Sequence, residues 1–238
     1  MKTITVTACS RPVYLRQALE SLRKNDVGQY KLFFGIEPGS GEVLEVCKSV
    51  DWMEKDITVN PRKLGVRVNP FTLLTKVFKE GSELNIYLEE DVVVSPDVTK
   101  LADWFLEAQR EESWLSLNLL NYKSTNTDPI GLLPSKHFNS LGLCIKPHAW
   151  KTWFEPNWLS DTAAQKVYQG RSVGWDWSMT AVLALEKDLQ TLTPVLSRSN
   201  HIGREGGVHA SPDFHDRTFP HLPINQDPSP GAYRINHA

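Results

Sequence analysis

The sequence lacks long apolar segments and has few cysteines. No run of about 18 apolar residues occurs in the 238-residue chain, so no transmembrane helix is predicted. Met1 and Lys2 lead into a short β-type run with alternating polar residues, unlike a signal peptide, and we expect a soluble, cytoplasmic protein without a membrane partner. The cysteines, Cys9, Cys47 and Cys144, are odd in number and widely spaced, which favours reduced, mostly buried thiols over a disulfide framework or a zinc site.

The net charge is also small, at −2, but the charges are segregated. Residues 1–31 carry six Lys or Arg and two acidic residues, and residues 60–79 carry five Lys or Arg and no acidic residue. Residues 80–112, in contrast, carry two Lys or Arg and ten acidic residues. The two basic segments could face an anion or could be ordinary solvated helix faces. The near-neutral total does not favour a protein that binds duplex nucleic acid by charge alone. Several of the eight tryptophans could line a cleft for flat sugar or base rings.

The hydrophobic pattern predicts a single α/β domain. Residues 3–8 form a β-branched run, and Leu15, Ala18, Leu19 and Leu22 then recur at helical spacing, as in a first βα unit. Further strands are expected at residues 32–36, 56–60, 85–88, 114–119 and 141–145, with a proline-containing edge strand at 191–196. Further helices are expected at residues 43–50, at 69–80, after Pro96, after Pro147 and from Trp175, with a polar loop at 121–137. This alternation indicates a mostly parallel sheet flanked by helices.

Three consecutive acids, Glu89-Glu90-Asp91, are the central feature. They end a predicted buried strand and precede three valines and Ser95-Pro96, a predicted N-cap and first helical residue. Adjacent carboxylates in such a corner repel one another and lose hydration, so a divalent cation would stabilise them. Mg²⁺ or Mn²⁺ is expected, since these ions combine one or two carboxylates with substrate phosphates. The alternative is an acidic triplet on a solvated loop.

Three other side chains are candidates for chemistry. Arg11 follows the first strand, where a guanidinium could hold phosphate or could simply start a helix. Glu37 follows the second strand and could accept a base N–H or cap a loop. Asp176 lies between Trp175 and Trp177, where partial desolvation would make it a proton acceptor, although an Asp here could instead cap the following helix.

The C-terminal segment from Ser197 differs in composition, with five of the seven histidines and a proline-rich end. Through Arg198 and Arg204 it could form a flap over a charged ligand, and residues beyond about 220 are expected to be a poorly ordered tail. His201 and His209 could bind metal, but their irregular spacing favours this only weakly. The predicted organisation is a domain at 1–215, with a donor half at 1–112, an acceptor half at 113–196 and a flap at 197–215, followed by a tail at 216–238.

Several motifs occur together in a characteristic order. They are Ile4-Thr5-Val6-Thr7-Ala8-Cys9-Ser10-Arg11, Leu88-Glu89-Glu90-Asp91, Ser95-Pro96-Asp97, Leu141-Gly142, Trp175-Asp176-Trp177, Leu196-Ser197-Arg198-Ser199 and Ile202-Gly203-Arg204-Glu205-Gly206-Gly207-Val208-His209. Over residues 3–215 this order resembles GT-A glycosyltransferases of the N-acetylglucosaminyltransferase I type. That family usually has Glu-Asp-Asp at the triplet and two adjacent aspartates between its tryptophans, so Glu90 and the single Asp176 are departures.

The resemblance implies a GT-A fold and a role for each matching position. Asp91 would bind Mn²⁺ or Mg²⁺, Glu90 would face the ribose of the donor and Glu89 its sugar. Arg11 and Glu37 would hold the nucleotide, and Asp176 would be the base. The sugar pocket would be formed by Leu141, Gly142 and Trp175. The loop that becomes ordered over the donor would contain Arg198, Ser199 and Arg204.

The expected function is metal-dependent, inverting transfer of N-acetylglucosamine or a related hexose from a UDP-sugar to a hydroxyl. The acceptor could be a glycan, a small molecule or, for a phage-type enzyme, hydroxymethylated pyrimidines in DNA. The absence of an anchor favours a bacterial or phage protein. A sugar nucleotidyltransferase is less favoured, because residues 9–12 lack a glycine-rich phosphate loop. A non-catalytic sugar-nucleotide-binding protein is the third alternative.

Overall fold

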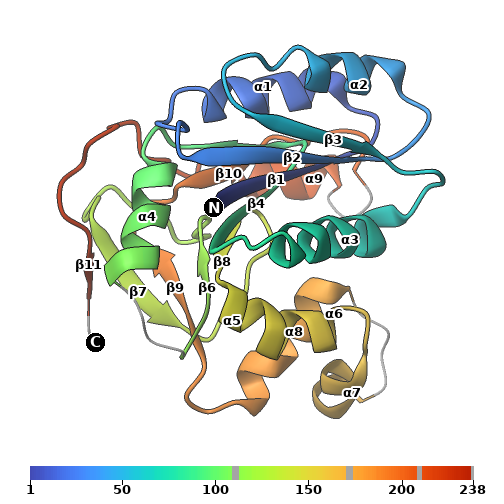
Figure 1. Ribbon diagram of the computed structural model, residues 1–238. Coiled ribbons are helices and arrows are strands. Elements are labelled where there is room, and N and C mark those ends of the chain that lie inside the picture. Colours follow the sequence, from blue (N-terminus) through green and yellow to red (C-terminus); the bar gives the residue numbers. More distant parts are fainter. Residues whose placement is uncertain (109–112, 170–173, 208–210, 237–238) are drawn as a thin grey trace.

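The computed structural model describes residues 1–108, 113–169, 174–207 and 211–236 (Figure 1). Its strands are β1 (Lys2–Ala8), β2 (Tyr30–Ile36), β3 (Lys55–Val59), β4 (Leu84–Glu89), β5 (Val92–Val94), β6 (Trp114–Asn118), β7 (Gly131–Ser135), β8 (Leu143–Ile145), β9 (Gln190–Pro194), β10 (Ser199–His201) and β11 (Arg234–Ile235). Its helices are α1 (Pro12–Leu22), α2 (Gly41–Lys48), α3 (Gly65–Lys79), α4 (Val98–Ala108), α5 (Pro147–Ala149), α6 (Glu155–Trp158), α7 (Thr162–Tyr168), α8 (Trp175–Leu185) and α9 (Pro212–Thr218), with a π-helical turn at Trp150–Phe154.

The described strands form one large mixed sheet and a small second sheet. The large sheet has the order β11-β7-β9-β6-β8-β4-β1-β2-β3, and β5 pairs with β10 in the second. β1 lies between β2 and β4 and is parallel to both, and β3 continues this parallel group. β8 runs antiparallel to β4 and β6, which makes the sheet mixed. The predicted α/β class, with a mostly parallel sheet flanked by helices, is confirmed.

Apolar side chains cover both faces of the large sheet. Successive residues of a strand point to opposite faces, so Phe34 packs in one core with side chains of α1, α2 and α4, whereas Phe33 packs in the other with those of α3 and α5 to α8. Figure 1 shows α1 and α2 on one side of the strands and α3 with α5 to α8 on the other. Burial of each large apolar side chain contributes about 2 kcal/mol, so the packing of helices on both faces of the sheet stabilises the fold. None of the helices in the described ranges is long and apolar enough to cross a bilayer.

The topology brings three loops to one edge of the sheet. β1, β2 and β4 are parallel, so the residues that follow their carboxyl ends, 9–11, Glu37 and 90–91, gather there. After Glu89 the chain leaves the large sheet, and β5 pairs antiparallel with β10, with Val92 opposite His201. The predicted strand-to-strand corner at the acidic triplet is therefore confirmed.

Two predicted helix starts are wrong. α3 begins at Gly65 rather than Asn69, which makes part of the expected basic loop helical and places Pro70 inside the helix. The earlier start is stabilised by Glu37, whose carboxylate accepts the Gly65 N–H at 2.6 Å. α4 begins at Val98 rather than Pro96, and the Ser95 hydroxyl donates to Asp97 Oδ1 instead of capping the helix.

Two predictions about strands are also wrong. β9 is not an edge strand, because it lies between β6 and β7. The sheet accommodates its proline because Pro194 is the last residue of the strand. The segment at 121–137 is not entirely a loop, because it contains β7, which pairs with β9 and with the C-terminal β11.

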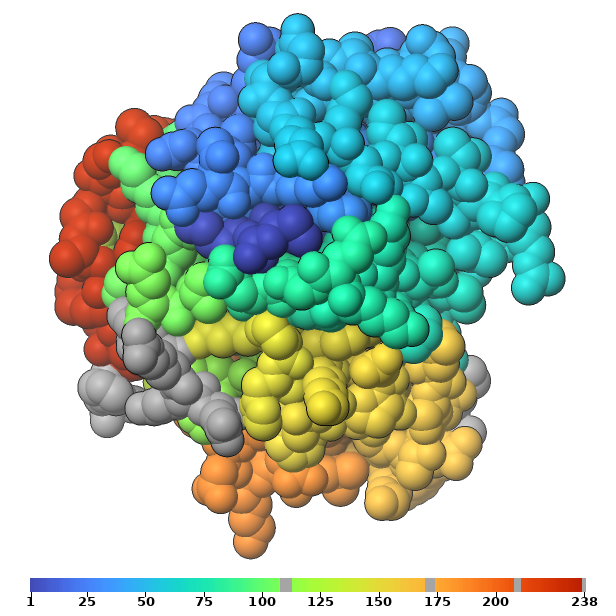
Figure 2. Space-filling view, viewed as in Figure 1, coloured from blue at the N-terminus to red at the C-terminus, as the bar shows by residue number. Residues whose placement is uncertain are grey.

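The C-terminal segment is packed along the molecule, in contrast to the poorly ordered tail that we expected. Figure 2 shows it on the outside of the molecule, next to the region of α4. The ring of Tyr233 lies 5.9 Å from that of Trp104 on α4, and β11 pairs in parallel with β7. The Asn225 N–H also donates to the Ser197 carbonyl at 3.0 Å. These interactions satisfy backbone and aromatic groups that a disordered tail would leave to solvent.

Candidate active site

Arg11, Glu90 and Asp91 meet at the carboxyl edge of the sheet. Arg11 Nε donates to Glu90 Oε1 at 2.7 Å, and the Cys9 N–H donates to Glu90 Oε2 at 2.7 Å. Arg11 Nη1 lies 2.8 Å from Asp91 Oδ2 in an ion pair, without a well-directed hydrogen bond. Glu90 therefore holds the loop after β1 in place. Both of its carboxylate oxygens are occupied by protein groups, whereas the resemblance implied that Glu90 would face the ribose of the donor.

His201 completes this corner from a distant part of the chain. Its Nε2 lies 3.1 Å from Asp91 Oδ2, and the Ile202 N–H donates to the Asp91 carbonyl at 2.8 Å. Burial acts to raise the pKa of Asp91, but the His201 hydrogen bond and the charges of His201 and Arg11 outweigh it and hold that pKa below its ordinary value. Asp91 Oδ1 and His201 Nδ1 are buried and make no hydrogen bond within the described part of the chain.

The groups at this corner fit a divalent cation that is shared with a ligand. Carboxylate oxygen and imidazole nitrogen both bind divalent metals, and the buried Asp91 Oδ1 has its lone pairs available. Among the described residues, no group of three or more His, Cys, Asp or Glu side chains gathers around one point. Asp91 and His201 would therefore be the protein ligands, with water or phosphate oxygens in the other positions. Gly203 backs this corner, since a Cβ there would lie 2.1 Å from Asp91 Oδ2.

Glu89 occupies a different environment from its two neighbours. The Tyr87 hydroxyl donates to its Oε1 at 3.0 Å. Burial, then repulsion from Asp91 and more weakly from Asp176, raises the pKa of Glu89 to about 7. A carboxyl group with this pKa exchanges a proton near neutral pH, so it can either donate a hydrogen bond to a sugar hydroxyl or accept one.

Asp176 lies in the first turn of α8, and Gly174, rather than Asp176, is the N-cap residue. Trp175 anchors this turn, because its ring stacks on Trp158 at 3.9 Å and meets Tyr87 edge-on at 5.9 Å. Tyr87 in turn contacts Glu89, so the helix start and the acidic triplet share one support. Because Trp175 is buried, its ring supports the start of α8 and does not line an open sugar pocket as predicted.

Leu141, Gly142 and Ser199 also come together. The Ser199 hydroxyl donates to the Leu141 carbonyl at 2.6 Å. Gly142 has a φ of +90°, and a Cβ there would lie 3.1 Å from Ser199 Oγ, so glycine is needed for both the backbone conformation and the close approach. This contact joins the loop before β8 to β10, one residue before Asn200 and two before His201.

Three predicted ligand-binding side chains contact the protein itself. Glu37 accepts the N–H groups of Leu64 and Gly65, so the loop-cap alternative describes its contacts. Arg198 is not on a flap surface, because it is fully buried and paired with Asp97. Arg204 is exposed and makes a bidentate pair with Asp216 of α9, in which Nε donates to Oδ1 and Nη2 donates to Oδ2. His209 lies outside the described residues.

No role is predicted from the sequence for Tyr87, Gly203, Asp97 or Tyr233, although Asp97 and Gly203 lie within its motifs. Gly203 could have been found from its place in the motif beside His201. Tyr87 sits two residues before Glu89, on the same face of β4, and this spacing is the signal that could have identified it. The roles of Asp97 and Tyr233 depend on contacts between distant segments, for which the sequence has no local signal.

Comparisons with known proteins agree on the architecture. No protein-family model and no curated protein matches the sequence. Residues 1–349 of S. aureus TarS match the structure with a TM-score of 0.57 and 13% identity, over 83% of this chain and 58% of that one. The mannosyltransferase PcManGT from Pyrobaculum calidifontis, in complex with GDP-Man and Mn²⁺, matches with a TM-score of 0.50 and 11% identity, over 82% and 55%. Mouse xyloside xylosyltransferase 1 matches with a TM-score of 0.50 and 14% identity, over 82% of this chain and 84% of that one.

The chain has the GT-A fold. It spans little more than half the length of the TarS and PcManGT chains that it matches. Identities this low establish the architecture and not the reaction. The narrower resemblance to the N-acetylglucosaminyltransferase I type stays a prediction.

Proposed function

We propose that this protein transfers a sugar from a nucleotide-diphosphate sugar, specifically a UDP-sugar, to an acceptor hydroxyl. One observation carries the proposal: Arg11, Asp91 and His201 meet in a buried corner at the ligand-binding edge of a GT-A sheet, and Asp91 Oδ1 is unpartnered there. The similar TarS structure has been solved with UDP and with UDP-GlcNAc, at TM-scores of 0.55 and 0.53. These complexes support a uridine donor, with N-acetylglucosamine or a related hexose as the transferred sugar.

In this proposal the acidic corner binds the donor diphosphate. Asp91 and His201 would hold Mn²⁺ or Mg²⁺, and the bound ion would supply positive charge that stabilises the leaving diphosphate. The Arg11 side chain is 18% exposed, so its guanidinium can turn from Asp91 toward a phosphate oxygen. Glu37 orders the loop at residues 64–65 on the nucleotide side, and Glu90 orders the loop that carries Arg11.

The transfer step uses Glu89 and Asp176. Glu89 binds a hydroxyl of the transferred sugar, next to a pocket formed by Leu141 and Gly142. The Asp176 carboxylate takes the proton from the acceptor hydroxyl while the acceptor oxygen bonds to the anomeric carbon, and the bond from that carbon to the diphosphate breaks with inversion.

A thermal-shift panel tests the donor and the metal together. UDP-GlcNAc, UDP-glucose and GDP-mannose are each added with and without Mn²⁺ to the wild type and to Asp91→Asn. We expect the largest rise in Tm for one UDP-sugar with Mn²⁺, and no such rise in Asp91→Asn. The proposal fails if no nucleotide sugar changes the Tm of the wild type. Radiolabel transfer to oligosaccharides or to hydroxymethylcytosine-containing DNA then identifies the acceptor class.

A further inference from the structure

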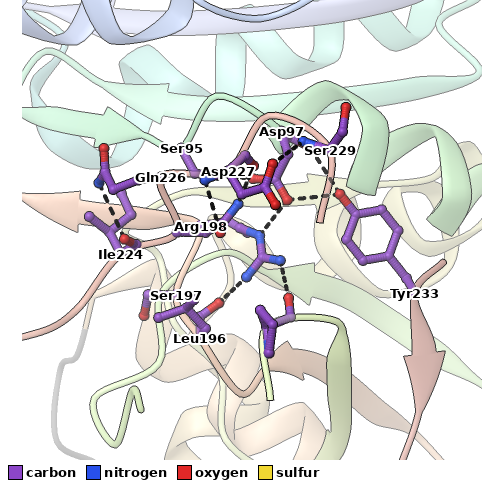
Figure 3. A network of polar contacts seen from close by, with 12 residues as sticks. Ser95, Asp97, Leu196, Ser197, Arg198, Ile224, Gln226, Asp227, Ser229 and Tyr233 are labelled. Carbon is purple, nitrogen blue, oxygen red and sulfur yellow. Dashed lines mark hydrogen bonds and ion pairs between the residues drawn. The ribbon is translucent and has the colours of Figure 1, made fainter. Parts of the chain in front are cut away.

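A second buried cluster lies at the far end of the small β5–β10 sheet (Figure 3). Arg198 Nε donates to Asp97 Oδ2 at 2.8 Å, and the two side chains are 1% and 0% exposed. The other guanidinium nitrogens of Arg198 donate to the carbonyls of Leu196 and Pro129. The cluster therefore ties the segment before α4 to the segment before β10 and to the loop before β7.

The C-terminal segment supplies the remaining member of this cluster. The Tyr233 hydroxyl donates to Asp97 Oδ2 at 2.8 Å, and its ring centre lies 5.8 Å from the Arg198 guanidinium. The Ser95 hydroxyl donates to the other Asp97 oxygen at 2.6 Å. Both Asp97 oxygens are thus satisfied, so the buried charges stabilise one arrangement of these segments.

Main-chain hydrogen bonds join this cluster to the candidate site. At one end of the small sheet the Ser95 N–H donates to the Arg198 carbonyl at 2.9 Å, and at the other the Ile202 N–H donates to the Asp91 carbonyl at 2.8 Å. Each strand between them has only three residues. A two-stranded sheet this short has little stability of its own, and a slip of one residue would turn His201 to the opposite face. Its register therefore depends on contacts outside the ladder.

We propose that Asp97, Arg198 and Tyr233 are positioning residues that fix the register of β10 and so hold His201 against Asp91. This inference rests on the proposed function, because it gives the cluster a role in metal binding. It also makes the C-terminal segment a functional part of the site, although Tyr233 does not contact Asp91 or His201. Loosening the cluster weakens the metal site from a distance.

Tyr233→Phe tests this role, with Tyr30→Phe as the matched control. Each substitution removes one hydroxyl that donates to an aspartate near α4, since Tyr30 donates to Asp103 Oδ1 at 2.5 Å. Asp103 otherwise contacts Lys2 and not β10. Replacement of Arg198 is avoided, because it would leave a buried carboxylate unpaired and strongly destabilise the protein. Both Tyr-to-Phe variants are studied as the full chain, well below their Tm.

Two readouts are measured: Mn²⁺ affinity, from the electron paramagnetic resonance signal of the free ion, and amide hydrogen exchange at residues 199–202. In Tyr233→Phe we expect Mn²⁺ to bind about tenfold more weakly and these amides to exchange faster, with neither change in Tyr30→Phe. Equal exchange in the two variants, or equal Mn²⁺ affinity, overturns the positioning role. If the wild type itself binds no Mn²⁺ even with UDP present, the metal-binding part of the proposed function fails, and the exchange data alone then decide whether the cluster fixes β10.

Discussion

The two buried charge clusters of this protein use the same groups in different ways. In each, an arginine nitrogen lies 2.8 Å from an aspartate oxygen. In the Asp97–Arg198 cluster both carboxylate oxygens accept hydrogen bonds. In the Arg11–Asp91 cluster, Asp91 Oδ1 and His201 Nδ1 are buried without partners in the described structure. Between these two clusters, the one whose carboxylate is fully hydrogen-bonded therefore has a structural role, and the one with unmet hydrogen-bonding capacity is the candidate ligand site.

Asp91→Ala should have the largest effect, because it removes the proposed metal ligand. We expect UDP-sugar turnover to fall by about a thousandfold or more, while circular dichroism stays unchanged. Donor hydrolysis and transfer are measured over a range of Mn²⁺ concentrations. Full turnover of this variant in the presence of a chelator would contradict the role of Asp91.

Asp97→Ala should act first on the stability of the fold, in addition to loosening β10. It leaves the Arg198 charge buried without its carboxylate, which should lower the free energy of unfolding by about 3 kcal/mol. Urea unfolding of this variant and of Asp91→Asn measures the contrast between the clusters. If Asp91→Asn is equally destabilising, the distinction between a structural and a ligand-binding cluster is wrong.

Gly203→Ala should have an intermediate effect on the site. The new Cβ would lie 2.1 Å from Asp91 Oδ2 and 2.9 Å from Arg11 Nη1, so the loop has to shift at a cost of about 2 kcal/mol. Calorimetric titration with Mn²⁺ and UDP should show weaker binding. Gly41→Ala is the control, since a Cβ at Gly41 meets no atom within 4 Å. Unchanged binding by Gly203→Ala would show that this loop does not back the site.

Glu89→Gln should have the smallest effect, and its sign depends on pH. The pKa of Glu89 is about 7 in the folded protein, above its ordinary 4.5, because burial and Asp91 disfavour the charged form. The folded state therefore binds the proton more tightly than the unfolded state, and the wild type loses stability as the pH rises from 4.5 through 7. The glutamine removes this loss, and since Glu89 is partly exposed we expect a gain of about 1 kcal/mol above pH 7.

Urea unfolding in chelator, at pH values below, within and above that interval, measures this difference. The gain of Glu89→Gln over the wild type should be absent at the acidic end and level off at the alkaline end. A gain that is independent of pH would contradict the raised pKa. Asp97 provides the contrast in the same experiment, because replacing that carboxylate by alanine should be destabilising throughout.

The sequence was sufficient for most of the fold, because the elements near β1 and β4 have strong local patterns. The β-branched run before Cys9 and the helical spacing of Leu15, Leu19 and Leu22 are examples. The start of α3 could not be predicted in this way, since it depends on Glu37 from another loop. The C-terminal segment was also misjudged, because its order comes from contacts of Tyr233 and Asn225 with distant residues.

The candidate site was predictable where it depends on strand ends. Arg11 and Asp91 follow adjacent parallel strands, so their proximity follows from the topology. The sequence could identify His201 as a candidate metal ligand but could not show that it contacts Asp91. The two residues are 110 positions apart in the sequence, and the pairing of β5 with β10 brings them together. Arg198 was predicted to bind a ligand, and its burial and fully paired guanidinium, which depend on distant contacts, distinguish it from Arg11.

In the proposed site, Asp91 binds a divalent ion together with a sugar-nucleotide diphosphate. Crystals grown with Mn²⁺ and UDP, with diffraction data collected at the manganese absorption edge, test it most directly. We expect an anomalous peak bonded to Asp91 and His201 and to the UDP phosphates, with Arg11 turned away from Asp91. UDP bound with no manganese at this corner, and with the Arg11–Asp91 ion pair intact, would contradict the claim.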